Sequence, residues 1–368
     1  MDTTEYKPGI EGVVAGISSI SMVDADENQL LYRGYDIHDL VENCDFEEVA
    51  YLLLHEKLPN ESEYVAFRER LAMDRGVPEP VLALMATLPV ETHPMDRLQA
   101  GTAALAAFLP RSMPPVRIAE RLLAKLPTLV CQGWRLSQGE APISPEPGDS
   151  HSANIFRQLT CHVPEAQTLR VFDAIQILYA EHGFNASTFA ARVTVSTLAE
   201  LNNGIVSAIG TLKGALHGGA NEAAMEMLLE IDTPERAAPW VQEALAQKKK
   251  IMGFGHREYK KGDTRAKIVK ALMPQLGGDT HWQEISDRVE TEMFTAKGLY
   301  PNLDFPVASA YYRMGLPIPL YTPLFVLSRV TGWSAHILEQ LANNRLIRPQ
   351  HVYNGARDRR VVPRERRE

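Results

Sequence analysis

The sequence is poor in cysteine and lacks the features of a secreted, disulfide-stabilised or membrane-spanning chain. Its 368 residues contain only three cysteines, Cys44, Cys131 and Cys161, which lie far apart and form no Cys-x-x-Cys pair. A disulfide framework and a zinc knuckle are therefore not expected. The first ten residues lack the basic and apolar stretches of a signal peptide, and no run of about 18 apolar residues occurs. We therefore expect a cytoplasmic protein without a membrane span.

The chain also lacks an excess of positive charge. Its formal net charge is −8 at pH 7 and its pI is about 5.8. Nucleic acids and membrane surfaces usually bind basic fields, so neither is an expected partner. A phosphate-bearing ligand would have to bind a local basic cluster.

Strand signals are scarce after residue 35, and helical periodicity dominates the rest of the chain. Residues 18–35 hold two short β-prone runs around the turn-rich sequence DADEN, which predicts a small hairpin. The fold class is therefore all-α with a small N-terminal β-hairpin, and the length favours two subdomains. Helical patterns cover 46–54, 62–75, 79–88, 169–214 with a break at 182–185, 220–230, 235–249, 265–275, 282–298, 307–313 and 324–343.

A histidine between small residues forms the first candidate site, in LKGALHGGANEA at 212–223. Gly218 and Gly219 follow His217 and let the backbone approach a ligand closely, and a helix follows them. The positive end of a helix dipole disfavours a protonated imidazole. A neutral His217 could therefore donate a hydrogen bond to a developing enolate oxygen. The alternative is a helix-capping loop with a solvated histidine.

Basic residues gather in one segment of this acidic chain. Residues 248–267 contain eight lysines and arginines but only two acidic residues. Gly253 and Gly255 let backbone N–H groups point at an anion. The segment is not a dinucleotide fingerprint, because Glu258 takes the place of the third glycine, and it holds no P-loop motif. It predicts a pocket for a phosphorylated nucleotide such as coenzyme A, although the lysine run 248–250 alone is better explained as a solvated face.

An aspartate and two arginines complete the candidate chemistry. Asp304, in YPNLDFPV, lies between apolar residues beside a helix start. It is either the N-cap of that helix or a partly desolvated general base with a raised pKa. Arg329 lies in the helical stretch VLSRVTGW and Arg348 in NNRLIRP. A structural salt bridge explains any one such arginine, whereas several around one pocket would suit a ligand with two carboxylates.

These stretches resemble the citrate synthase family in its shorter bacterial form, over nearly the whole chain. The resemblance rests on LLYRGYDIHDL, FEEVAYLLLHEKLP, HPMDRLQAG, AEHGFNASTFAARV, GTLKGALHGGANEA, IMGFGHREYKKGDTRA, PNLDF, LYTPLFVLSRVTGWSAHILEQ and NNRLIRP. Together these stretches are highly specific. LFVLSRVTGW and NNRLIRP also resemble the 2-methylcitrate synthase branch.

The resemblance implies a condensation of acetyl-CoA with oxaloacetate, followed by hydrolysis to citrate and CoA, as in the tricarboxylic acid cycle. Asp304 matches the base that removes a proton from the acyl group. His217 matches the residue that hydrogen-bonds the thioester oxygen and stabilises the enol. His256 matches the residue that protonates the carbonyl oxygen of oxaloacetate. No metal and no permanently bound cofactor is implied, because the coenzyme A thioester is a co-substrate.

The resemblance also implies binding residues and partners. Oxaloacetate would be held by His182, Arg265, Arg329 and Arg348, and Arg348 would reach the partner's site in a homodimer. Coenzyme A would bind at Lys250, Gly253, Gly255, Arg257 and Lys260.

The implied domain plan has three parts. A large helical domain would span 1–214, and a small domain at 215–315 would carry the CoA loop and the catalytic residues. Residues 316–368 would return to the large domain and form a C-terminal dimer arm. Closing the cleft between the domains would exclude water during condensation.

Two positions depart from the family pattern. Thr264 stands where the family usually has proline before Arg265, which frees the backbone there. Pro306 stands where the family often has tyrosine, which changes the pocket wall beside Asp304. Neither departure removes a reacting group.

Three alternatives stay open at this point. The first is a 2-methylcitrate synthase that uses propionyl-CoA, because one extra methylene changes binding by only about 1–3 kcal/mol. The second is a non-catalytic paralogue that binds coenzyme A or oxaloacetate as a sensor. The third is a lyase that runs the same chemistry backward on citryl-CoA.

Overall fold

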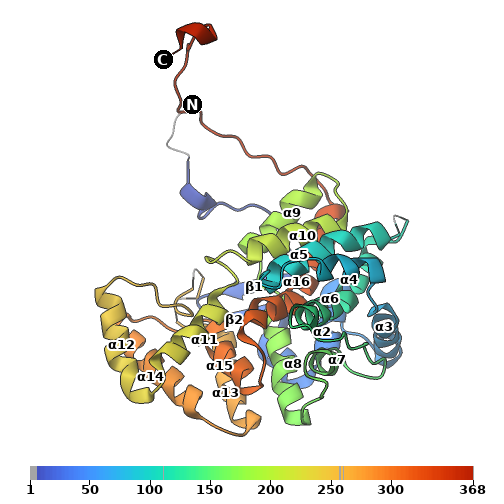
Figure 1. Ribbon diagram of the computed structural model, residues 1–368, viewed down its shortest axis with the longest axis vertical. Helices are drawn as coiled ribbons and strands as arrows, with labels where there is room; N and C mark the ends of the chain where they lie inside the picture. The colour runs from blue at the N-terminus through green and yellow to red at the C-terminus, as the bar shows by residue number, and fades with distance from the viewer. Residues whose placement is uncertain (1–5, 111, 257, 260, 368) are drawn as a thin grey trace.

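The computed structural model describes residues 6–110, 112–256, 258–259 and 261–367 of the chain. These residues form a mainly helical protein with one small sheet, as the sequence predicts (Figure 1). Among them, no helix combines the length and apolar character that crossing a membrane requires.

The sheet is antiparallel, with strands β1 (Ser21–Asp24), β2 (Gln29–Tyr32) and β3 (Tyr35–Asp36) in sequential order. The helices are α1 (Ile37–Asn43), α2 (Phe46–His55), α3 (Glu61–Asp74), α4 (Glu79–Ala86), α5 (Pro94–Leu105), α6 (Pro115–Ser137), α7 (His151–Thr160), α8 (Ala166–Ala180), α9 (Ala186–Ser196), α10 (Leu201–Leu212), α11 (Ala220–Ile231), α12 (Pro234–Ala246), α13 (Thr264–Leu272), α14 (His281–Lys297), α15 (Asp304–Arg313) and α16 (Tyr321–Ala342).

The predicted hairpin is confirmed, and its turn is fixed by local hydrogen bonds. The Asp24 carboxylate accepts from the backbone N–H groups of Asp26 (2.9 Å) and Glu27 (3.0 Å). Asn28 completes the turn in the left-handed region, with φ of 55°, which asparagine tolerates better than most residues. The hairpin therefore presents a defined turn at 24–29.

Helix α16 forms the centre of the larger helical group. It packs against α2, α5, α6, α8, α9 and α10, and nearly every residue along it is buried. A helix that is apolar all round belongs in a protein core. Among the polar residues that α16 also buries is Arg329, which is 2% exposed, so α16 carries a guanidinium group into the interior.

Helices α11 to α15 form a second group that packs mainly on itself, drawn in yellow and orange in Figure 1. Helix α11 also contacts α16, and α13 contacts α8. This group coincides with most of the predicted small domain at 215–315, whose independence as a domain stays a prediction.

The structure differs from the predicted helices in several places. Helices α1, α5 and α7 lie outside the predicted ranges, and two further differences concern α9 and α6. The stretch 169–214 breaks a second time, at 197–200, where Leu198 adopts a positive φ of 68°. No proline or glycine marks that break, so periodicity alone passes over it. Helix α6 was not expected, because Pro127 inside it interrupts the helical signal.

Candidate active site

The loop that carries His256 is held against the start of α15 by strand-like pairing. The N–H of Gly255 donates to the carbonyl of Tyr300 (2.9 Å), and the N–H of Asn302 donates to the carbonyl of Gly253 (2.9 Å). Both glycines have positive φ, 83° and 77°. A Cβ atom on Gly253 would lie 2.8 Å from Cβ of Phe305, so glycine is required there. The pairing therefore brings the loop close to Asp304.

Asp304 is the first residue of α15, and its side chain does not cap the helix. The hydroxyl of Tyr179 donates a hydrogen bond of 2.7 Å to Oδ1 of Asp304. Burial raises the pKa of Asp304 to about 6, although the Tyr179 hydrogen bond and the charge of Arg265 act in the opposite direction. The N-cap alternative is therefore wrong, and a carboxylate with a raised pKa suits a general base.

His217 is half-buried and has a defined proton position. Its Nε2 accepts from the backbone N–H of Ser187 (3.3 Å) and lies 2.8 Å from the Ser187 hydroxyl. The ring proton of the neutral form therefore sits on Nδ1. Burial, followed by the charge of Arg329, lowers the pKa of His217 to about 4. The imidazole is therefore neutral at pH 7.

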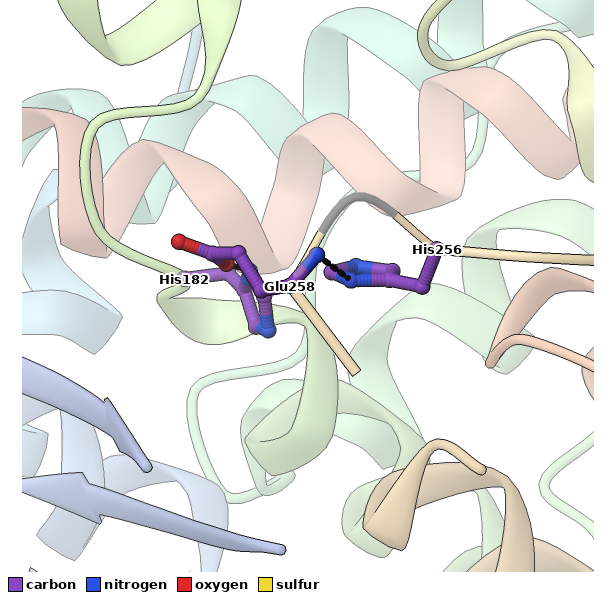
Figure 2. A group of neighbouring side chains, drawn as sticks. All are labelled: His182, His256 and Glu258. Carbon is purple, nitrogen blue, oxygen red and sulfur yellow. Dashed lines mark hydrogen bonds and ion pairs between the residues drawn. The ribbon is translucent and has the colours of Figure 1, made fainter. Parts of the chain in front are cut away.

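His256 has the opposite tautomer. Its Nδ1 accepts from the backbone N–H groups of Glu258 (3.1 Å) and Tyr259 (3.3 Å), and Figure 2 shows the first of these bonds. The ring proton of the neutral form is therefore on Nε2. The ring of His182 lies 5.0 Å away, edge to face. Burial, followed by the charges of Arg265 and His256, holds the pKa of His182 well below its ordinary value.

His182, His256 and Glu258 have the spacing of a metal site. Their ligand atoms all lie within 4.8 Å of one another (Figure 2), and two histidines with a glutamate can hold zinc. However, Nδ1 of His256 already accepts two N–H groups, and the charges of Arg265 and Arg329 both act on His182. A cation would be repelled here, so the cluster suits the oxygens of an anion better than a metal.

Arg265 is held in place by a neighbouring carboxylate. Its Nε and Nη2 donate to the two carboxylate oxygens of Asp263, at 3.0 and 2.8 Å. Asp263 also accepts the backbone N–H of Leu303 (3.1 Å). The buried Asp263 carboxylate therefore links Arg265, which is predicted to bind oxaloacetate, to Leu303, the residue that precedes Asp304.

Arg329 reaches the same region from α16. Its Nε donates to the carbonyl of Tyr179 (2.6 Å), and its guanidinium group stacks on the ring of Phe325. Burial lowers the pKa of Arg329 to about 10, so it remains charged at pH 7. Its charge acts on His182, His217 and Asp304, so all three side chains lie within electrostatic reach of Arg329.

Several residues of this site were not identified from the sequence. Tyr179 binds Asp304, Ser187 orients His217, and Asp263 holds Arg265. Glu181 is fully buried and accepts from the Ser21 hydroxyl and from Nε2 of His336, both at 2.9 Å. All except Ser21 lie within a few residues of a predicted site residue or in the same motif, and that proximity is the signal that the sequence offered.

Four predicted binding residues lie elsewhere or cannot be placed. Arg348 is exposed in the segment that follows α16, and Lys250 is exposed where the loop begins. Arg257 and Lys260 lie outside the described residues. The roles of these four residues stay predictions.

A separate hollow of about 930 Å³ lies between α13 and α14, with Lys270, Phe294 and Arg313 among its lining residues. None of the residues that line it belongs to the predicted site. Perturbed pKa values and convergent polar groups identify a functional site better than volume does, so we assign the active site to the cluster around Asp304.

The effect of Tyr179 on the pKa of Asp304 can be tested by mutation. Because the hydrogen bond from Tyr179 lowers the pKa of Asp304, Tyr179→Phe should raise it. The base must be ionised, so the acid limb of the kcat/KM profile, expected near pH 6, should move to higher pH. Tyr311→Phe is the matched control, because the buried Tyr311 hydroxyl has no partner among the described residues. An acid limb that stays in place in Tyr179→Phe would show that Tyr179 does not tune the base.

Comparisons with known proteins agree with this geometry. The sequence model of the family described as citrate synthase, C-terminal domain, matches residues 9–350. A 2-methylcitrate synthase from Mycobacterium tuberculosis is 43% identical, over 98% of this chain and 93% of its own. Citrate synthase 2 from Bacillus subtilis is 44% identical, over 98% of both chains.

A solved structure has the same fold. It is citrate synthase from the thermophilic archaeon Thermoplasma acidophilum, in ternary complex with carboxymethyl coenzyme A and oxaloacetate. It superposes with a TM-score of 0.91 at 32% identity, over 99% of this chain and 100% of that chain. The sequence match, the shared fold and the cluster around Asp304 all lead to the same assignment: the chain belongs to the citrate synthase family.

Proposed function

We propose that this protein condenses acetyl-CoA with oxaloacetate and hydrolyses the product to citrate and free CoA. The observation that carries the proposal is the environment of Asp304. This carboxyl group has a raised pKa and lies within electrostatic reach of two buried arginines. A base of moderate strength beside an anion-binding region is what such a condensation needs.

The first step is removal of a proton from the acyl group. Ionised Asp304 accepts a proton from the methyl carbon, and the thioester becomes an enol or enolate. The Nδ1–H of His217 donates a hydrogen bond to its oxygen, since Nε2 already accepts from Ser187. A neutral donor in a buried site stabilises the developing charge without being deprotonated itself.

The second step forms the carbon–carbon bond. The enol carbon attacks the carbonyl carbon of oxaloacetate, and the Nε2–H of His256 donates to the oxygen on which negative charge develops. Its Nδ1 accepts from two backbone N–H groups, so its proton faces away from the loop. The proton that Asp304 took from the acyl group then replaces the one that His256 gave to the new hydroxyl group. Water cleaves the thioester: its oxygen enters the new carboxyl group, the CoA sulfur leaves as the thiol, and ionisation of the carboxyl group releases one proton.

Oxaloacetate is bound, in this proposal, by charge and by hydrogen bonds. Arg265 and Arg329 bind its carboxylates, and neutral His182 contributes a hydrogen bond. Arg348 of a second copy completes the site, which makes the working unit a homodimer. Arg348 is exposed, and the C-terminal segment that follows α16 runs outward from the helical body (Figure 1), which leaves it accessible to a partner.

The CoA nucleotide, in this proposal, binds along the loop that contains Gly253 and Gly255, with Lys250 at its edge. The small domain at 215–315 then closes on the large domain and excludes water from the enolate. Closure would keep the loop and Asp304 against His182 and against Arg329 of α16, the contacts that this structure already makes through Tyr179 and His256.

The experiment supplies the purified protein with oxaloacetate and either acetyl-CoA or propionyl-CoA, and follows the free CoA thiol. We expect release only when oxaloacetate is present, with acetyl-CoA turned over at the higher kcat/KM. A higher kcat/KM for propionyl-CoA would assign the 2-methylcitrate synthase activity instead. Release without oxaloacetate would identify a hydrolase, and the absence of any release would refute the proposal.

A further inference from the structure

The turn of the N-terminal hairpin contacts the segment that precedes and begins α13. The Lys261 ammonium group donates to the carbonyl of Asp26 (2.9 Å). With its amide oriented so that both of its ends are satisfied, Asn28 donates to the carbonyl of Gly262 (2.6 Å) and accepts from the Lys267 ammonium group (3.3 Å). Two turn residues therefore hold three positions of the segment 261–267.

A second element holds the same segment. Nε2 of His38, in the first turn of α1, lies 2.9 Å from the hydroxyl of Thr264. Thr264 is 3% exposed, whereas His38 is exposed. The Asp36 carboxylate fixes this part of α1, because it accepts from the N–H of His38 and from the amide of Gln29 in β2, both at 2.8 Å. The hairpin and α1 therefore act on the segment as one body.

The segment 261–267 contains a residue that the proposed reaction needs. Arg265 lies between the contacts made by Gly262, Thr264 and Lys267, and Asp263 ties it to Leu303. The segment is thus fixed on one side to α15, which begins with the proposed base. On its other side it is fixed to the hairpin and α1.

We propose that Asp26, Asn28 and His38 form a clasp that holds the segment 261–267 in the position from which Arg265 binds oxaloacetate. The clasp residues touch no substrate, so they are positioning residues that act through Arg265. The inference rests on the proposed function, since it assigns oxaloacetate to Arg265.

The clasp joins the two helical groups of the molecule. The hairpin and α1 precede α2 and α8 of the larger group, and α13 belongs to the group α11–α15. When the clasp is open, Arg265 is competent for binding only part of the time. The apparent affinity for oxaloacetate is then the intrinsic affinity multiplied by the fraction of molecules in which Arg265 is in its binding position. Turnover of the fully bound enzyme does not change.

The hydroxyl of Thr264 supplies the contact between the segment 261–267 and His38 of α1. The bond to Nε2 of His38 requires the Thr264 hydroxyl, so a residue without a polar side chain at this position would lose it.

The test compares wild-type protein with Asn28→Gly, Thr264→Val and the double variant. Glycine tolerates the positive φ of residue 28, and valine keeps the shape of threonine. Thr291→Val is the matched control, since Thr291 is exposed on α14 and, among the described residues, its hydroxyl bonds the carbonyl of Asp287 alone. We expect each clasp variant to raise KM for oxaloacetate about three- to tenfold. The double variant should raise it further, with kcat unchanged within about twofold.

Two further measurements keep the outcome decisive. Thr264→Ser restores a hydroxyl and should return KM to the wild-type value. Hydrogen exchange of the amides of 261–267 should accelerate in the double variant but not in Thr291→Val. Unchanged KM together with unchanged exchange in a folded double variant would overturn the clasp. If wild-type protein releases no thiol, the proposed function fails, and the exchange measurement alone decides the clasp.

Discussion

Asp304→Asn is expected to lower kcat for thiol release by about 10³-fold or more, within the range that a positioned general base contributes. The amide cannot accept the proton from the acyl group, yet it keeps the size of the carboxyl group and one acceptor for Tyr179. Oxaloacetate affinity, measured by calorimetry, should stay within about threefold of wild type, because Arg265 and Arg329 supply the binding. Near-normal turnover would dismiss Asp304 as the base.

The same substitution should stabilise the protein. Burial raises the pKa of Asp304 from 3.8 to about 6, so the folded state binds a proton that the unfolded state releases between these values. Stability is therefore lost as pH rises through this interval, and at pH 7 the ionised carboxylate costs up to about 3 kcal/mol. Asp304→Asn should raise the melting temperature at pH 7, and the gain should vanish as pH falls below about 4. A lower melting temperature at pH 7 would contradict this account of its environment.

Arg329→Gln is expected to weaken oxaloacetate binding by about 10²- to 10³-fold, the usual cost of truncating one partner of a buried charged pair. The substitution removes the positive charge that acts on His182, His217 and Asp304. It should also raise the pKa of both imidazoles, because that charge lowers them. Calorimetry with oxaloacetate measures the loss of affinity directly.

The matched control is Arg329→Lys. Lysine keeps the charge but lacks the planar guanidinium group that binds a carboxylate with two parallel hydrogen bonds. It should recover part of the affinity and keep the pKa of His217 near its wild-type value. Equal affinity in Arg329→Gln and in wild-type protein would show that α16 does not contribute to the oxaloacetate site.

The sequence predicted the helical class because its signals were local. Apolar residues recurring every three or four positions predicted most helices, and the DADEN turn predicted the hairpin now seen at Ser21–Tyr32. The break at 197–200 escaped prediction because no proline or glycine marks it; α9 ends where Leu198 adopts a positive φ. The N-cap alternative for Asp304 failed for a related reason: its partner, Tyr179, comes from α8, which lies far away in sequence.

The sequence predicted which residues form the candidate site wherever those residues lie in a recognisable motif. His217, His256 and Asp304 lie in glycine-rich or apolar stretches that stand out in the sequence. Their tautomers could not be predicted, because these depend on Ser187 for one ring and on the backbone of Glu258 and Tyr259 for the other. A hydrogen bond to a backbone N–H depends on the loop conformation and leaves no pattern in the sequence.

The most direct test is a crystal structure with oxaloacetate and an acyl-CoA analogue that cannot be deprotonated. The account predicts that the acyl carbon lies within about 3.5 Å of an Asp304 carboxylate oxygen, with its carbonyl oxygen on Nδ1 of His217. The keto oxygen of oxaloacetate should meet Nε2 of His256. An acyl group bound away from Asp304, or an oxaloacetate whose carboxylates avoid both Arg265 and Arg329, would contradict it.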